Sequence, residues 1–374
     1  MQTPRYEYSR SVIQDKIQEF MKLRSPFGLT VRYAMKANPY PEILKMMDKS
    51  DIHFDASSSY EAVKLLKLGI KGSRISLSSQ QSPHNLDELL SRDVLFVATS
   101  LKQLELFLNT KERPDTIGIR INPDYGSGHN NRTSTGGVSA GFGIWHEYIP
   151  QILAITSEHN IKVDRLHIHI GSGADPKIWQ SVMNKSLEIV KLLPDVHTLD
   201  IGGGYKIHRY GQEQEANMQD VMNTFSEQLQ AFFELTNRKI HLEIEPGTYF
   251  IAHAGVLVAQ IDDIVDTGEN GYLFIKLNTG MNDFLRSSLY GAQHNIEVIN
   301  NNTNTKEYVV IGHNCESGDI FTPAKGNPEK IETRTLKEAT IGDTVKIYDV
   351  GAYCASMRAR GYNSFPDADE VMVE

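Results

Sequence analysis

The segment VRYAMKANPYPEILKMM, residues 31–47, places a lysine between a predicted buried strand and a predicted helix. Its first residues suit a strand, which Asn38-Pro39 ends. Pro41 then suits the first turn of a helix whose apolar residues repeat at helical spacing. Lys36 therefore stands at the carboxyl end of a strand that points into the fold, and a cation in that position calls for a chemical reason.

The same alternation of a short β-rich run and a longer helical pattern continues to about residue 250. Crossovers long enough to hold helices indicate a parallel sheet, and eight strands are the number that closes into a TIM-type (β/α)8 barrel. We prefer this barrel to an open doubly wound sheet. The predicted strands are residues 30–35, 52–55, 75–78, 94–98, 117–122, 165–170, 197–201 and 240–245.

After about residue 255 the pattern changes to β runs separated by turn-rich segments such as NNNTNTKE, residues 300–307. This pattern predicts a C-terminal antiparallel β domain. We assign residues 26–252 to the barrel. Residues 1–25 and 253–374 are assigned to a β-sandwich or β-barrel-like domain.

The charge balance excludes some classes of protein. Lys and Arg total 38 against 47 Asp and Glu, for a net charge of -9, and no basic run is present, which argues against nucleic-acid binding. No stretch approaches the roughly 18 apolar residues of a membrane span, and the first residues lack the apolar core of a secretory signal. Two cysteines, Cys315 and Cys354, suggest no disulfide framework, so we expect a cytoplasmic protein.

Polar or small residues stand at the ends of most predicted strands: Lys36, Asp55, Ser78, Asn122, His169, Gly202 and Glu245. In a barrel these ends converge on one mouth. Each residue alone also has a structural explanation. Asp55 suits a helix cap, for example, and a strand histidine is most often a core residue. Together they predict an active site.

The chemistry of this set points to a cofactor. A partly desolvated Lys36 can attack a carbonyl to form a Schiff base. The glycines of DIGGGY, residues 200–205, let backbone N–H groups approach a phosphate, although a tight turn explains them equally well. Glu245 suits either a protonated ring nitrogen or a structural ion pair. The combination matches the needs of pyridoxal 5'-phosphate, and no metal site is predicted.

Longer motifs extend over nearly the whole chain: TPRYEY (3–8), YAMKAN (33–38), FDASSSYE (54–61), HIHIGSG (167–173), DIGGGY (200–205), EPG (245–247), GMNDFLRSSLY (280–290), CESGD (315–319) and GAYCASMRARGYN (351–363). With these motifs the chain resembles the barrel-fold pyridoxal-phosphate decarboxylases, the fold type III group with an alanine-racemase-like barrel. Within that group it most resembles the diaminopimelate decarboxylases.

The resemblance implies roles for individual residues. Lys36 would hold the cofactor aldehyde, His169 would stack on its ring, and Cys315 would be the proton donor after carbon dioxide leaves. The other implied cofactor contacts are Asp55, Ser172, Gly203, Gly204, Glu245, Gly247 and Tyr353. The implied substrate contacts are Arg286, Tyr290, Glu316 and Tyr353.

The resemblance also implies a homodimer in which the CESGD loop reaches the active site of the neighbouring subunit. The expected reaction converts meso-diaminopimelate to L-lysine and carbon dioxide. Two departures from the family pattern leave the substrate open: Thr248 follows EPG where an arginine is usual, and Gly141 stands where a lysine is common.

Several alternatives therefore remain. The same chemistry on ornithine, lysine, arginine, a D-amino acid or a siderophore or antibiotic intermediate is one. A non-catalytic pyridoxal-phosphate homeostasis protein is another, although such proteins are usually a barrel alone.

Four features have competing interpretations. Cys315 is also compatible with an inert core thiol, and Arg286 with an ion pair to Asp283. His167, two residues before His169, is interpreted as structural. Residues 127–137, rich in Gly, Asn and Ser, suit either a mobile flap or a surface loop.

Overall fold

The computed structural model describes residues 2–111, 113–126 and 135–374, so residues 127–134 of the predicted flap lie outside the described residues. The chain divides into two compact units. The barrel unit comprises Ile17–Lys206 and Gln214–Tyr249. The β unit comprises the residues up to Lys16, Ile207–Glu213 and Phe250–Glu374. Compared with the boundaries expected from the sequence, residues 17–25 lie in the barrel unit, and residues 207–213 and 250–252 lie in the β unit.

The barrel unit contains a closed parallel sheet, as the sequence predicts. Its order is β5-β4-β3-β2-β10-β9-β8-β6, and pairing of β5 with β6 closes the barrel. A short strand, β7 (Ile144–Trp145), also pairs with β6 and was not predicted. The barrel strands are β2 (Leu29–Ala34), β3 (His53–Ala56), β4 (Ile75–Ser78), β5 (Leu95–Ala98), β6 (Thr116–Asn122), β8 (Lys162–His167), β9 (Thr198–Asp200) and β10 (His241–Ile244).

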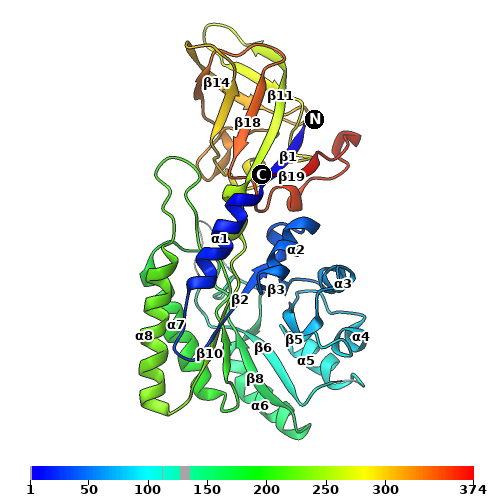
Figure 1. Cartoon of the computed structure of the whole chain (residues 1–374), viewed down its shortest axis with the longest axis vertical. Coiled ribbons are helices and arrows are strands. Elements are labelled where there is room, and N and C mark those ends of the chain that lie inside the picture. Colours follow the sequence, from blue (N-terminus) through cyan, green and yellow to red (C-terminus); the bar gives the residue numbers. More distant parts are fainter. Residues whose placement is uncertain (1, 112, 127–134) are drawn as a thin grey trace. The chain divides into compact units, whose positions relative to one another are not determined.

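Helices surround these strands (Figure 1). Because parallel neighbours need crossovers, a helix follows most strands and buries its apolar face on the sheet. In α2, for example, Ile43, Leu44 and Met47 are buried and Pro41 occupies the first turn. The helices are α1 (Arg10–Lys22), α2 (Pro41–Lys49), α3 (Ser59–Lys67), α4 (Leu86–Leu90), α5 (Leu101–Leu108), α6 (Ile149–Glu158), α7 (Pro176–Leu192), α8 (Met218–Thr236) and α9 (Thr248–Ile251).

Two side chains cap the start of helix α3. The Ser58 side chain accepts a hydrogen bond from the Glu61 N–H at 3.2 Å, and Glu61 accepts one from the Ser57 N–H at 2.7 Å. The alternative interpretation of Asp55 as the cap of this helix is therefore wrong, because Ser58 has that role.

An ion-paired group lies inside the barrel among its apolar side chains. Arg32 donates from Nε and Nη2 to the two carboxylate oxygens of Glu243, at 2.9 Å each. Arg165 pairs with the same carboxylate. Arg32 and Glu243 are only 2% and 3% exposed, so each charge depends on its partners for compensation.

The β unit is mostly antiparallel. Its sheet has the order β13-β18-β11-β12-β14-β17, and β1 pairs antiparallel with β11. Two pairs are parallel: β12 with β14, and β1 with β19. The strands are β1 (Arg5–Ser9), β11 (Gly255–Asp266), β12 (Leu273–Leu277), β13 (Ile296–Ile299), β14 (Thr305–Ile311), β17 (Arg334–Lys337), β18 (Thr344–Tyr348) and β19 (Asp369–Val373), with a separate hairpin of β15 (Pro323–Ala324) and β16 (Asn327–Ile331).

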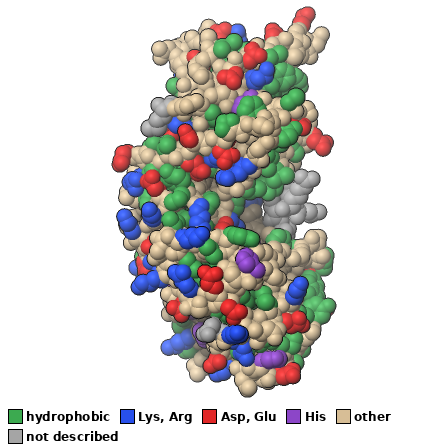
Figure 2. Space-filling model, turned by 90° about the vertical axis from the view of Figure 1, so that its right-hand side faces the viewer, with side chains coloured by type: hydrophobic (Ala, Val, Ile, Leu, Met, Phe, Trp, Pro, Cys, Tyr) green, Lys and Arg blue, Asp and Glu red, His purple; other side chains and the backbone are tan. Residues whose placement is uncertain are grey.

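The surface carries charges of both signs. Figure 2 shows Lys and Arg side chains interspersed with Asp and Glu on the face in view. In the described part of the chain, no helix has the length and apolar character needed to cross a membrane.

Candidate active site

Lys36 lies in a short 3-10 turn, Met35–Ala37, directly after β2. Its Nζ is 2.7 Å from Asp55 Oδ2 and 2.9 Å from Ser57 Oγ. The Asp55 side chain is 2% exposed whereas that of Lys36 is 40% exposed, so the amine is held by a buried carboxylate and still reaches solvent. Ser57 directly follows β3. Its contact with Lys36 was not predicted from the sequence.

His169 and the glycine run come together just beyond β8 and β9. The Gly203 N–H donates a hydrogen bond to His169 Nδ1 at 3.3 Å. A Cβ at Gly202 would collide with the His169 ring, and one at Gly203 would collide with the Glu245 carbonyl. Only glycine permits these approaches. Burial, with the positive charges of Arg120 and Lys36, lowers the pKa of His169 well below its usual value, so its ring is neutral.

Two other predicted phosphate contacts border this glycine run. Ser172 lies in the loop after β8, where the Gly173 N–H donates to the Gly204 carbonyl at 3.0 Å. Gly247 is buried in the turn after β10, and the preceding Pro246 carbonyl accepts a hydrogen bond from the Ala34 N–H at 3.2 Å. The turns after β8, β9 and β10 therefore meet at one end of the barrel.

Glu245 is a buried acid beside other acids. It is 4% exposed, and its Oε2 lies 3.5 Å from His167 Nε2. Burial raises the pKa of Glu245 well above its usual value, and the negative charges of Asp200 and Asp55 raise it further. Within the described residues Glu245 Oε1 has no hydrogen-bond partner. The carboxyl group therefore holds a proton and offers one oxygen to a ligand.

These residues fit pyridoxal 5'-phosphate. Lys36 supplies an amine, and the turn at residues 202–204 has no side chains of its own, so its backbone can approach a phosphate closely. Two of its N–H groups, those of Gly202 and Gly203, already donate to Asp200 Oδ1 and His169 Nδ1. Two buried oxygens, Glu245 Oε1 and Asp55 Oδ1, have no hydrogen-bond partner among the described residues. Each could accept a hydrogen bond from, or donate one to, a polar group of a ligand. Buried polar atoms are rarely left unpaired without a functional reason, so this end of the barrel has the features of a cofactor site.

Arg286 and Tyr290 lie on a short helix of the β unit, α10 (Arg286–Tyr290), with the guanidinium 6.0 Å from the tyrosine ring centroid. The alternative pairing of Arg286 with Asp283 is wrong. In the described chain Arg286 forms no ion pair, and Asp283 instead accepts hydrogen bonds from Thr279 and the Ala368 N–H.

Arg209, which the sequence analysis missed, is a neighbour of Arg286. Burial and the positive charge of Arg286 lower the pKa of Arg209 to about 10. The Nε atoms of both arginines are buried without a hydrogen-bond partner, and neither guanidinium pairs with a carboxylate of the described residues. Glu213 and Asp349 lie close enough to raise the pKa of Arg209, but neither forms an ion pair with it within the described residues. Two adjacent guanidinium groups without an ion-paired carboxylate suit an anionic ligand. No sequence motif marks Arg209.

Cys315 and Glu316 are exposed in a loop that follows β14. The Cys315 N–H donates to Asn363 Oδ1 at 2.7 Å, and the Tyr362 hydroxyl donates to Glu316 Oε2 at 3.3 Å. Asn363 holds a left-handed φ of 49° to make this contact. Exposure of Cys315 argues against an inert core thiol; Cys354, by contrast, is buried.

Tyr353 also has a left-handed φ, 57°, which is costly for a bulky residue and commonly marks a functional site. Its neighbour Cys354 is fully buried, and burial raises the pKa of that thiol to about 12. Together with Arg286, Tyr290, Cys315 and Glu316, Tyr353 belongs to the β unit, whereas the other predicted site residues belong to the barrel unit.

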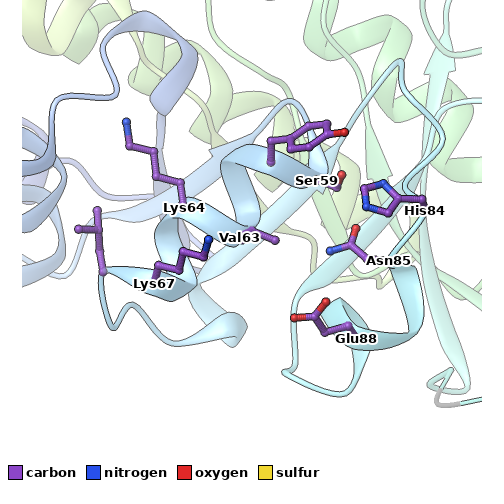
Figure 3. Close-up of a pocket in the computed structure, with 9 residues that line it drawn as sticks. Ser59, Val63, Lys64, Lys67, His84, Asn85 and Glu88 are labelled. Atoms are coloured by element: carbon purple, nitrogen blue, oxygen red, sulfur yellow. The ribbon is translucent and has the colours of Figure 1, made fainter.

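An open hollow lies elsewhere, on the outer side of the barrel unit. This open groove of about 640 Å³ runs between Lys64 and Lys67 of α3 on one side and His84, Asn85 and Glu88 at α4 on the other (Figure 3). It contains none of the predicted site residues. The convergence of reactive groups, rather than volume, therefore identifies the candidate site.

Comparisons with known proteins agree with this geometry. The sequence model of the pyridoxal-dependent decarboxylase, pyridoxal binding domain, matches residues 10–252. A diaminopimelate decarboxylase of Streptomyces coelicolor is 30% identical over 391 residues, covering 100% of this chain and 84% of the relative. One from Buchnera aphidicola subsp. Schizaphis graminum is 31% identical over 386 residues, covering 100% and 89%.

A solved structure is similar as well. The crystal structure of diaminopimelate decarboxylase from Helicobacter pylori complexed with L-lysine has a TM-score of 0.87 and 28% identity, covering 100% of this chain and 92% of that one. The matching family model spans well over half of the chain and includes the whole barrel. The chain therefore belongs to the pyridoxal-dependent decarboxylase family, whose cofactor, pyridoxal phosphate, suits the residues at the barrel mouth.

Proposed function

We propose that the protein decarboxylates meso-diaminopimelate to L-lysine with pyridoxal phosphate. The observation that carries the proposal is the convergence of Lys36, Asp55 and Glu245 at the mouth of a barrel whose similar relatives, at 30% and 31% identity, are diaminopimelate decarboxylases. When bound, the cofactor supplies the electron sink that accepts the electron pair of the broken carbon–carbon bond.

Lys36 is the residue proposed to hold the cofactor covalently. An amine must lose its proton before it attacks an aldehyde. Asp55 Oδ2, 2.7 Å from the amine, is the adjacent acceptor, and Ser57 Oγ at 2.9 Å keeps the amine in place. Asp55 and Ser57 thereby orient Lys36 at the start and the end of the reaction.

The other barrel residues bind and orient the cofactor. His169, neutral and anchored by the Gly203 N–H, offers a flat ring surface for stacking. The backbone of Gly203, Gly204 and Gly247, with Ser172, suits the phosphate. Glu245 suits the ring nitrogen, because its buried carboxyl can give a proton to that nitrogen and then stabilise the resulting positive charge.

The proton that replaces the lost carboxylate is proposed to come from Cys315, with Glu316 and Tyr353 near the substrate. Cys315 Sγ is exposed and its loop is held by Asn363, so the thiol can serve a site outside its own loop. The family resemblance implies that this loop serves the site of a second subunit, so we propose a homodimer with shared sites. The two free thiols also fit a cytoplasmic protein.

Arg286 and Tyr290 are proposed to bind the distal end of the substrate. Arg286 and its neighbour Arg209 have no carboxylate partner in the described structure, which favours a substrate with a second carboxylate. Ornithine, lysine and arginine have no distal carboxylate and would gain nothing from this pair.

The substrate is tested by measuring carbon dioxide release from diaminopimelate, ornithine, lysine and arginine. Diaminopimelate should be preferred, and Arg286→Ala or Arg209→Gln should raise its KM by about tenfold or more, as expected for the loss of a charge-assisted hydrogen bond. Arg92→Ala, at an exposed position of the barrel unit, is the control. Equal loss with every substrate would refute recognition of the distal carboxylate.

The cofactor attachment is tested by absorbance. Purified protein should show the visible band of a lysine-bound pyridoxal, and Lys36→Ala should lack it. Lys67→Ala removes an exposed lysine of the same unit and should keep the band. An unchanged band in Lys36→Ala would assign the attachment to another residue.

A further inference from the structure

Two buried side chains at the barrel mouth have no part in the function proposed above. Ser78 ends β4 and His167 ends β8, and they are 5% and 2% exposed. Ser78 Oγ lies 3.1 Å from His167 Nδ1. In the sheet, β5 and β6 separate β4 from β8 on their shorter path, so this hydrogen bond crosses the barrel interior rather than following strand pairing.

The direction of this hydrogen bond follows from what surrounds it. The Ser78 hydroxyl has no other acceptor among the described residues, so it donates its proton to Nδ1 of His167. Burial, with the positive charge of Arg120, lowers the pKa of His167 well below its usual value, so the ring is neutral. A neutral imidazole that accepts at Nδ1 carries its hydrogen on Nε2.

That Nε2–H faces Glu245. The distance from His167 Nε2 to Glu245 Oε2 is 3.5 Å, and Nε2 forms no hydrogen bond within the described residues. A protonated carboxyl group attracts the donor only weakly, whereas hydrogen bonds to a carboxylate are shorter and stronger. The contact should therefore tighten when Glu245 loses its proton.

Asp200 completes the cluster. One nitrogen or oxygen atom from each of His167, Asp200 and Glu245 lies within 4.8 Å of the others. Asp200 accepts a hydrogen bond from the Gly202 N–H at 2.9 Å and shares a side-chain hydrogen bond with Glu245. Burial raises the pKa of Asp200, whereas the Gly202 hydrogen bond and the positive charges of Arg32 and Arg165 lower it. Of the two acids, Asp200 is thus the better site for the negative charge and Glu245 for the proton.

We propose that Ser78 and His167 are positioning residues for Glu245. Ser78 fixes the ring of His167, and the Nε2–H of His167 holds Oε2 of Glu245. This arrangement leaves Oε1, which has no partner among the described residues, to meet the ring nitrogen of the cofactor. The inference rests on the proposed role of Glu245. It gives a role in orienting Glu245 to His167, which was interpreted as structural, and to Ser78, which had no individual role.

The test compares Ser78→Ala and His167→Phe with a matched control, Ser76→Ala. Ser76 lies two residues before Ser78 on the same strand, is 1% exposed and has no hydrogen-bond partner for its hydroxyl within the described structure. Each protein is titrated with pyridoxal phosphate, its bound-cofactor absorbance spectrum is recorded, and kcat and KM are measured. Thermal unfolding without cofactor reports whether each variant is folded.

Ser78→Ala and His167→Phe should lower kcat by about 10- to 100-fold, the range for one hydrogen bond to a charged group, with KM nearly unchanged. Both should shift the absorbance spectrum of the bound cofactor, and Ser78→Thr, which keeps the hydroxyl, should restore the wild-type spectrum. Ser76→Ala should match the wild type.

Two results would overturn the inference in different ways. If wild-type protein binds pyridoxal phosphate but Ser78→Ala matches Ser76→Ala in spectrum and kcat, the positioning role fails and the proposed function stands. If wild-type protein does not bind pyridoxal phosphate, both the proposed function and the inference that depends on it are wrong. His167→Phe removes a ring from a tight interior, so Ser78→Ala decides the matter if that variant does not fold.

Discussion

Glu243 lies in β10 and Glu245 directly follows that strand. The two identical side chains have different roles because their neighbours differ. Both point into the barrel and both are buried, at 3% and 4% exposure. Glu243 has two arginine partners, whereas Glu245 has a neutral histidine and two nearby acids. The first is therefore a structural anion and the second a protonated acid. The sequence HLEIEPG predicts two carboxyl groups on one strand face but not this division, because their partners come from distant strands.

The raised pKa of Glu245 predicts a stability effect in the cofactor-free protein. Above the usual glutamate pKa of about 4.5, the unfolded chain ionises while folded Glu245 keeps its proton, so stability falls as pH rises toward the folded pKa. Glu245→Gln removes this loss. We expect its melting temperature to exceed that of the wild type by about 2 °C or more at pH 8, with the two converging near pH 4, while activity is lost.

Thermal unfolding at several pH values checks this expectation. Glu243→Gln is the contrasting variant, because it breaks an ion pair and should be less stable than the wild type throughout. A pH-independent difference between Glu245→Gln and the wild type would show that Glu245 is already ionised in the folded protein.

At the scale of elements, the sequence predicted all eight barrel strands, most of them to within a residue or two. Buried runs such as ISLS, residues 75–78, are bounded by turn residues, and segments with helical periodicity separate them. The sequence therefore shows where these strands begin and end. In the β unit, short or exposed strands such as β13 and β16 were missed. The parallel pairing of β12 with β14 has no local signal either, because pairing partners are chosen by the tertiary fold.

The ion-paired interior gives a prediction for β10. Glu243→Ala leaves Arg32 and Arg165 without their shared carboxylate in a buried setting, which typically costs about 3–5 kcal/mol. Glu188→Ala breaks an exposed pair with Lys191 and should cost about 0–1 kcal/mol. Urea unfolding of the two variants measures both, and similar midpoints would show that the interior network adds no stability.

At the scale of the whole molecule, the predicted site residues are divided between the two units. The motifs predict which residues belong to the site, because each combines an unusual side chain with a turn. Arg209, Ser57 and the support of Glu245 were not predicted, since each depends on contacts between segments far apart in the sequence.

The proposed shared-site dimer predicts complementation between two inactive variants. Lys36→Ala and Cys315→Ala should each lose activity by orders of magnitude. After dissociation and mixing, half of the dimers would contain one of each, and every such dimer would have one complete site. Activity should therefore recover to about a quarter of the wild-type value. If mixing restores nothing, Lys36 and Cys315 act from the same subunit.

Strand β1 has a consequence for how the chain is made. It lies between β11 and β19, Asp369–Val373, so both of its partners come from segments far along the chain. Its second edge therefore stays uncovered until β19 has been synthesised. The barrel unit contains no residue of β19, so it can fold on the ribosome while the β unit is still open.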